Sequence, residues 1–176
     1  MAIAVDGVTE PGLVSIRREG INHVLEARTW LPGHTREMVF PVFADAFNLE
    51  TLTPDWLRFR VVTRPPIDIQ RGTLIDYRLR VRGVPIRWRS LISEWHPPYF
   101  FVDTQVAGPY ALWRHEHRLA EAPGGVMAAD RVLYRTRGGR LVHAIAAPAL
   151  ANRDLRRIFE YRLWALRSLL LPGGRP

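Results

Sequence analysis

Two histidines lie two residues apart near the middle of the chain, in the segment Trp-Arg-His-Glu-His. Alternate side chains of an extended strand share one face, so His115 and His117 are expected to point the same way. Asp103 lies in the preceding run of strand-forming residues, and Asp130 lies in the following one. A carboxylate beside an imidazole orients the ring and raises its basicity. These four residues are therefore candidate catalytic groups, suited to proton abstraction next to a carbonyl.

Two more polar residues continue this pattern, because Gln105 shares the expected face of Asp103 and Tyr134 shares that of Asp130. The six residues could instead satisfy one another as a buried network that fixes the register of the sheet. They could also recognise polar atoms of a ligand. All three interpretations stay open at this point. A His-x-His pair with an aspartate can also chelate a metal, but this spacing is common by chance, and we expect no metal and no cofactor.

Aromatic residues on the same expected faces would form the walls of a binding site. Trp88 and Trp113 flank the polar residues, and Phe159 lies on the apolar face of a predicted C-terminal helix. Arg162 lies one turn from Phe159, where it could reach water, pair with Asp130, or pair with a ligand carboxylate. The candidate ligand-binding residues are Tyr77, Trp88, Asp103, Gln105, Trp113, His115, His117, Tyr134, Phe159 and Arg162.

The elements that would position these residues follow from hydrophobic period and from breaks. Runs at 87–95, 100–106 and 111–119 are separated by His-Pro-Pro and Gly-Pro, a pattern typical of an antiparallel meander. Apolar residues at helical spacing predict one long helix from Pro148 to a Pro-Gly-Gly stop at residue 172. The remaining expected elements are strands at 21–30, 56–63, 73–81 and 126–135 and short helices at 35–45 and 48–53. Residues 1–20 are expected to form an irregular arm, 21–171 one domain, and 172–176 a tail.

Composition limits the possible partners. A chain of 176 residues fits one domain, and the absence of cysteine excludes disulfides and thiol nucleophiles. All 25 basic residues are arginine and the net charge is +8, but the arginines are spread along the chain, so no nucleic-acid partner is expected. No run approaches the ~18 apolar residues of a membrane helix and no secretory leader is recognisable, so we expect no membrane span and a cytoplasmic location. The oligomeric state is not predicted.

Several motifs together resemble the START/Bet v 1-like superfamily of polyketide cyclase/dehydrase and lipid-transport proteins, and small bacterial ligand-binding members in particular. The resemblance covers roughly residues 22–171. The motifs are Leu31-Pro32 with Val39-Phe40, Asn48 to Pro54, Gly83 to Trp88, Phe101 to Gln105, Gly108-Pro109-Tyr110, and Trp113 to His117. It implies an α+β helix-grip fold, in which a curved antiparallel sheet of about six to seven strands wraps around a long C-terminal helix.

The resemblance also implies a function class. Superfamily members bind hydrophobic ligands, so we expect a small hydrophobic molecule in an internal cavity between sheet and helix. One alternative is a cyclase or dehydratase acting on a polyketide-like substrate through His/Asp acid–base chemistry. Another is a non-catalytic accessory protein with a filled core. Whether the protein is an enzyme stays open.

Overall fold

The computed structural model describes residues 12–137 and 148–171, and the strands of this part form one antiparallel sheet. The strand order is β1-β2-β8-β7-β6-β5-β4-β3. The strands are β1 Leu13–Glu19, β2 Asn22–Pro32, β3 Arg60–Val61, β4 Leu74–Val81, β5 Val84–His96, β6 Phe100–Ala107, β7 Tyr110–Ala122 and β8 Gly125–Thr136. The helices are α1 Arg36–Phe43, α2 Asn48–Thr51, the 3₁₀ turn η1 Asp55–Leu57, and α4 Pro148–Leu170.

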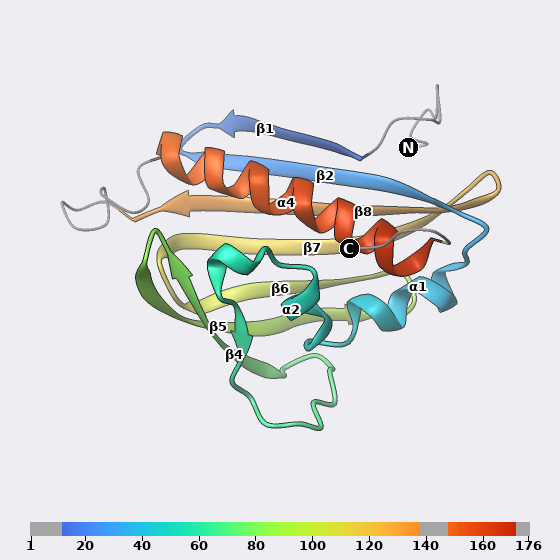
Figure 1. Cartoon of the computed structure of the whole chain (residues 1–176), viewed down its shortest axis with the longest axis horizontal. Helices are drawn as coiled ribbons and strands as arrows, with labels where there is room; N and C mark the ends of the chain where they lie inside the picture. Colours follow the sequence, from blue (N-terminus) through green and yellow to red (C-terminus); the bar gives the residue numbers. More distant parts are fainter. Residues whose placement is uncertain (1–11, 138–147, 172–176) are drawn as a thin grey trace.

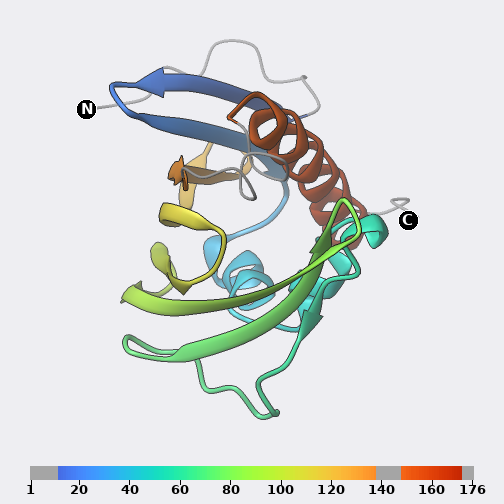
Figure 2. The same ribbon diagram turned by 90° about the vertical axis from the view of Figure 1, so that its left-hand side faces the viewer.

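The sheet is strongly curved, and α4 runs along its concave side (Figures 1 and 2). Viewed end-on, the sheet bends from β1 and β2 round to β4 and β5, while α4 and the short helices lie across the open side. This arrangement is the predicted helix-grip fold. The described sheet has eight strands, rather than the six to seven expected from the sequence.

The C-terminal helix buries one continuous stripe. Leu155, Phe159, Leu163 and Leu166 are all buried, as their helical spacing predicted, whereas Ile158 is only partly buried. The helix contacts β1 and β2, and it is joined to them by arginines that reach backbone carbonyls. One side of α4 is therefore fixed to the sheet, and the other side faces the space inside the curve.

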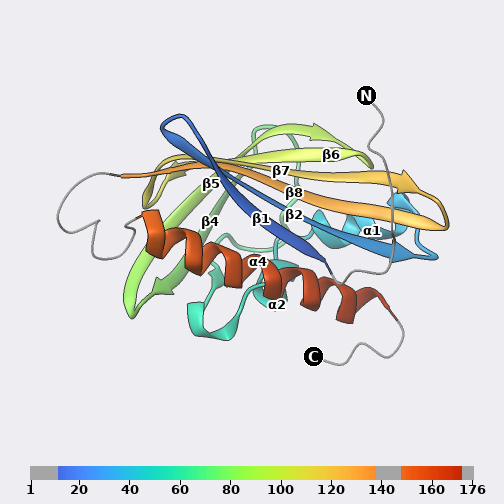
Figure 3. The ribbon, with the colours of Figure 1, turned by 90° about the horizontal axis from the view of Figure 1, so that it is seen from above.

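The first strand was not expected. Leu13–Glu19 pairs with β2 over its full length and contributes Val14 to the core, so an irregular arm is wrong for these residues. Residues 1–11 lie outside the described part. β1 is an edge strand of the sheet (Figure 3). Its charged residues at positions 17 to 19 discourage other strands from pairing with this edge. The same charges hide the alternation of apolar and polar residues that would have predicted a strand.

The expected strand at 56–63 is also different. Its first residues form η1, and only Arg60 and Val61 pair with β4. Arg58 adopts a left-handed backbone with φ 45°, and its amide closes the turn onto the carbonyl of Asp55. A residue in this conformation cannot continue a strand, so the chain turns before the short edge strand begins.

Three irregularities of register shape the inner face. Along β5, Trp88, Ser90 and Ile92 face inward, and the register shift between Ile92 and Glu94 then moves the inward phase by one residue. Trp95 therefore packs against the core. The other two shifts lie between Arg89 and Ser90 of β5, opposite β6, and between Tyr110 and Leu112 at the start of β7. One extra residue exchanges the two faces of a strand, so these bulges decide which side chains reach the interior.

The outer face of the meander carries charged side chains, as the alternation predicted. Arg114 pairs with Glu94 at 2.9 Å and with Glu116 at 3.4 Å, and Arg118 pairs with Glu116 at 2.8 Å. These arginines have acidic neighbours in the sheet and do not form an uncompensated basic surface. In the described residues, no helix has both the length and the apolar character that crossing a membrane requires.

Candidate functional site

A cavity of about 190 Å³ lies between the concave sheet face and α4. Its walls are mainly aliphatic and aromatic side chains from every layer of the fold. Eight of the ten predicted ligand-binding residues line it: Tyr77, Trp88, Asp103, Trp113, His115, His117, Phe159 and Arg162. Trp88 and Trp113 pack edge to face, with ring centroids 5.0 Å apart, and form one wall. The cavity is therefore apolar over most of its surface and polar at one place.

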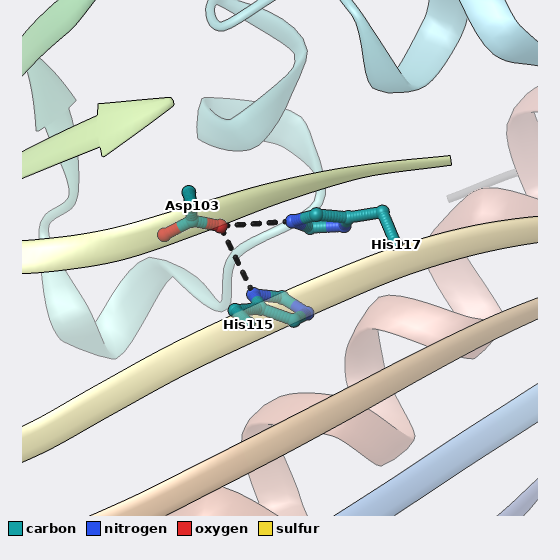
Figure 4. Close-up of side chains that lie close together, drawn as sticks. All are labelled: Asp103, His115 and His117. Carbon is teal, nitrogen blue, oxygen red and sulfur yellow. Dashed lines mark hydrogen bonds and ion pairs between the residues drawn. The ribbon is translucent and has the colours of Figure 1, made fainter. Parts of the chain in front are cut away.

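That polar place is a closed ring of two histidines and two aspartates, which we call the His–Asp ring: Asp103, His115, His117 and Asp130. His117 lies 2.9 Å from Asp103 through Nε2 and 3.0 Å from Asp130 through Nδ1. His115 lies 2.9 Å from Asp130 through Nε2 and 3.5 Å from Asp103 through Nδ1. Each imidazole thus bridges both carboxylates. Figure 4 shows Asp103 on β6 facing both rings of β7.

Strand register explains why these four residues meet. His115 pairs with Val132 and with Asp103 on its two sides, and His117 pairs directly with Asp130. The side chains of β6, β7 and β8 at these positions therefore point to the same face, and the two histidine rings lie 3.7 Å apart between centroids with their planes inclined by 38°. The sequence prediction that these four side chains point inward together is confirmed by these contacts.

A second set of groups holds the carboxylates in place. Ser90 donates its hydroxyl to Asp103 Oδ1 at 3.1 Å, and the indole N–H of Trp88 donates to Ser90 at 3.0 Å. Arg162 on α4 lies 3.4 Å from Asp130 through its Nε. Of the three outcomes open for Arg162, the pair with Asp130 is the one observed, and the side chain is buried.

Aromatic rings enclose the imidazoles. Phe101 stacks on His117 with centroids 4.2 Å apart, and Phe43 approaches the same ring edge-on at 6.1 Å. Phe159 approaches His115 at 5.5 Å. These contacts keep water from the rings, and they fix both ring planes. The polar groups therefore have one geometry and a low local dielectric, in which charge–charge interactions are strong.

Burial and the ring of charges act in opposite directions on each pKa. Burial opposes ionisation of Asp130, but Arg162 and the two histidines outweigh it and hold the pKa of Asp130 well below its usual range. Burial likewise opposes ionisation of Asp103, yet the hydrogen bond from His117 and the charge of His115 leave its pKa lowered. Both carboxylates are therefore ionised near neutral pH.

The two histidines differ. Burial lowers the pKa of His115 to about 4, and the positive charge of His117 acts in the same direction. Burial also opposes protonation of His117, but hydrogen bonds to Asp103 and Asp130 outweigh it and raise its pKa. A neutral His115 has one N–H, and its shorter contact puts that N–H on Nε2 toward Asp130. Its Nδ1 lone pair is then directed toward Asp103.

Two of the six polar residues expected to lie together, Gln105 and Tyr134, lie outside the His–Asp ring. The side-chain amide of Gln105 donates to the carbonyl of Tyr110 at 2.8 Å and accepts from its N–H at 3.2 Å, so Gln105 closes the β6–β7 turn. Tyr134 donates its hydroxyl to Asn152 at 2.6 Å and packs among buried side chains beside β1 and β2. Neither lines the described cavity. The prediction that all six polar residues form one hydrogen-bonded network is therefore wrong. The β6–β7 turn provides the partner of Gln105, and α4 provides the partner of Tyr134.

Sequence analysis missed Ser90 and the aromatic neighbours of His117. Ser90 could have been found, because it lies two residues after Trp88 and shares its inward face. Phe101 could have been found from Asp103 by the same argument. Phe43 had no comparable signal, since its position against His117 depends on how α1 packs across the end of the sheet.

We expect Ser90→Ala to destabilise the fold by roughly 1–3 kcal/mol, because it leaves the Trp88 indole and Asp103 without their shared partner in a buried site. The matched control is Ser93→Ala, whose hydroxyl makes one contact of 3.3 Å to the carbonyl of Val102. Chemical denaturation of both variants measures the difference. Equal stability losses would show that the Ser90 hydroxyl does not support the His–Asp ring.

Comparison with known proteins supports the fold. No protein-family model matches the sequence, and no curated protein is significantly similar to it. CV1439 from Chromobacterium violaceum is 16% identical, with 85% of this chain and 98% of that chain covered and a TM-score of 0.65. The Zhui aromatase/cyclase from Streptomyces sp. R1128 is 15% identical, with coverages of 88% and 99% and a TM-score of 0.60.

A plant protein has the same architecture. The major latex-like protein 151 from Panax ginseng is 9% identical, with 87% of this chain and 100% of that chain covered and a TM-score of 0.62. Likeness at these identities concerns the fold. The chain thus has the helix-grip fold, as the resemblance in its sequence implied.

Proposed function

We propose that this protein binds one small hydrophobic molecule that carries one or two polar groups. The observation that carries this proposal is the apolar cavity between the sheet and α4, which has Asp103, His115 and His117 of the His–Asp ring in its wall. Binding sites for small molecules are typically apolar hollows with a few convergent polar groups. An accessory protein with a filled core, the third class considered, needs no such space.

The dimensions of the cavity limit the ligand. Its volume is about 190 Å³, and an engineered apolar cavity of ~150 Å³ in another protein admits benzene. A ligand of roughly one to two rings therefore fits without rearrangement. Trp88, Trp113 and Phe159 line the space and offer flat surfaces for such a ring system.

The polar end of the ligand would face Arg162 and Asp103. Arg162 has five N–H donors, and its described acidic contact is one carboxylate at 3.4 Å. It also lines the cavity. A carbonyl or carboxylate oxygen on the ligand would accept from this guanidinium, and a ligand hydroxyl would donate to Asp103.

Acid–base catalysis is the second candidate, favoured by the 2.9 Å contact between His117 and Asp103 in the cavity wall. One of the proteins with a similar fold is an aromatase/cyclase. The pKa of His115, about 4, makes this histidine a weak base near neutral pH, so acid–base chemistry would need His117, whose two nitrogens already contact Asp103 and Asp130. Ligand binding therefore accounts for the site with fewer requirements.

A cavity-filling substitution tests the binding proposal. Ala151 is buried on α4 and lines the cavity. We expect Ala151→Phe to place a ring in the ligand volume and to abolish saturable quenching of tryptophan fluorescence by small aromatic ketones and carboxylates. The same compounds should raise the melting temperature of the wild type, because a ligand at a hundred times its Kd adds about 2.7 kcal/mol.

The matched control is Leu169→Phe, which adds an aromatic ring on the exposed side of the same helix. It should bind the compounds like the wild type. If wild type and Ala151→Phe respond equally across the compound series, ligands do not enter this cavity. If no compound stabilises the wild type, the accessory role replaces the binding role.

A further inference from the structure

In the His–Asp ring, each histidine contacts one aspartate through each of its two ring nitrogens. The carboxylate of Asp130 contacts one ring nitrogen of each histidine: Nε2 of His115 at 2.9 Å and Nδ1 of His117 at 3.0 Å. Both imidazoles can donate N–H groups to that single carboxylate. The remaining nitrogens, Nδ1 of His115 and Nε2 of His117, are then both directed toward Oδ2 of Asp103, at 3.5 Å and 2.9 Å.

We propose that Asp103, His115 and His117 form a binding site for one divalent transition-metal ion. Two imidazole nitrogens and a carboxylate oxygen converge there, and these three atoms can coordinate one cation when the ion displaces the proton from His117. Metal-bound histidines nearly always donate their other N–H to a carboxylate or carbonyl, which fixes the tautomer. Asp130 is in position to do this for both histidines at once.

The distances agree with coordination. Metal–nitrogen and metal–oxygen bonds of roughly 2.0–2.2 Å give ligand separations of about 3.3 Å in a tetrahedral site. The two measured separations, 2.9 and 3.5 Å, lie on either side of that value, and all three donor atoms lie within 4.8 Å of one another. Small side-chain adjustments would therefore bring three donors around one ion.

The groups behind the three donors are also those that a metal site needs. Ser90 donates to Oδ1 of Asp103, which leaves Oδ2 for the ion. Arg162 pairs with Asp130 at 3.4 Å and orients the carboxylate that holds the histidines. Phe101 and Phe43 fix the plane of His117. Each proposed ligand thus has a partner that sets its direction.

Charge favours a cation as well. The two ionised aspartates and Arg162 sum to −1, and either a proton on His117 or a cation compensates this charge in the buried site. A divalent ion changes the sum to +1. An anionic or carbonyl oxygen of a cavity ligand would then complete the coordination, because all three proposed metal ligands line the cavity. This site would take oxygen-donor ligands and polarise them.

Two histidines and one carboxylate with an open position suit Zn²⁺, Fe²⁺, Co²⁺ or Mn²⁺ rather than Ca²⁺ or Mg²⁺, which prefer all-oxygen ligands. The proposal does not rest on the hydrophobic-ligand function, because metal binding is measured on the protein alone. A failure of either proposal therefore leaves the other standing.

Cobalt titration of the untagged, chelator-stripped full-length chain is the direct test. We expect saturation at one Co²⁺ per chain, with visible d–d absorption of a nitrogen- and oxygen-coordinated ion, and displacement by one equivalent of Zn²⁺. Elemental analysis after dialysis against Zn²⁺ measures the stoichiometry independently. A spectrum that stays that of hydrated Co²⁺, or no retained zinc, would overturn the proposal.

Variants locate the ion. Asp103→Asn keeps the shape of the side chain but removes the anionic ligand, and it should abolish the one-to-one complex. Asp130→Asn removes the carboxylate behind both histidines and should weaken Zn²⁺ binding by about 10- to 100-fold. The control pair His34→Gln and His96→Gln alters histidines that do not line the cavity and should bind like the wild type.

Circular dichroism of each variant establishes that it is folded before titration. If Asp103→Asn fails to fold, His117→Gln replaces it, since the wild-type spectrum and stoichiometry already decide whether a site exists. If metal binding at the wild-type level survives the loss of Asp103 or His117 but is lost in the His34→Gln and His96→Gln controls, the ion binds at the surface. That result would refute the proposal.

Discussion

Deleting residues 148–176 is expected to abolish cooperative folding. α4 provides the buried side chains of Leu155, Phe159, Leu163 and Leu166 to the concave face of the sheet. Each large apolar side chain contributes roughly 1.5–3 kcal/mol on burial, and net stability of a domain is only about 5–15 kcal/mol. Without the helix, the inner face of the sheet and the His–Asp ring would be open to water.

The truncated chain should therefore aggregate or show no sharp thermal transition by calorimetry and circular dichroism. Point variants separate packing from chain length: Leu163→Ala should cost about 2–5 kcal/mol, whereas Leu169→Ala, exposed on the other side of α4, should change stability by less than about 0.5 kcal/mol. A truncation that melts cooperatively would show that the sheet does not depend on the helix.

Much of the fold could be predicted from local pattern. The meander from β5 to β7 follows from alternation interrupted by two proline-containing breaks, and α4 follows from leucine spacing between two prolines. The sequence predictions failed where tertiary contacts determine the local structure. β1 is an edge strand whose charges hide its alternation, and the left-handed Arg58 turns residues 55–57 into a 3₁₀ turn.

The candidate site divides in the same way. The four residues of the His–Asp ring lie in uninterrupted parts of three paired strands, so their shared phase was predictable. Gln105 lies near the end of β6, next to a turn and at the register shift between Arg89 and Ser90, and its amide binds the turn instead. The partner of Tyr134 is Asn152, on an element far along the chain. The alternation along a strand predicts the face to which each side chain points. The hydrogen-bond partner of that side chain depends on other elements of the fold, which the alternation does not describe.

This distinction also bears on the interpretations left open for the polar residues. The buried-network interpretation accounts for the mutual contacts of the four residues. It does not account for the position of Asp103, His115 and His117 in the wall of an apolar cavity, where hydrophobic residues would pack as well. Replacing buried ion pairs by apolar side chains is often neutral or stabilising. A polar cluster in this place therefore favours a role in binding.

Asp130→Ala is expected to destabilise the protein by about 3–5 kcal/mol, the largest effect of any single substitution in the site. Asp130 is the shared partner of Arg162, His115 and His117, and its removal leaves a buried guanidinium without its carboxylate. Arg162→Met should partly restore stability in the double variant, because the uncompensated cation is then gone. Arg162→Met alone should cost less than Asp130→Ala, since both histidines still contact the carboxylate of Asp130.

Urea denaturation of the four proteins in the double-mutant cycle measures the coupling between Asp130 and Arg162, expected at roughly 0.5–3 kcal/mol for side chains in direct contact. Asp76→Ala is the matched control, because Asp76 pairs with Arg89 at 2.7 Å on the exposed face of the same sheet. Surface pairs contribute only about 0–1 kcal/mol, so that variant should remain near wild-type stability. Similar losses for Asp130→Ala and Asp76→Ala would show that the charge inside the curve of the sheet is solvated like the charge outside it. The His–Asp ring could then not act as a desolvated binding site.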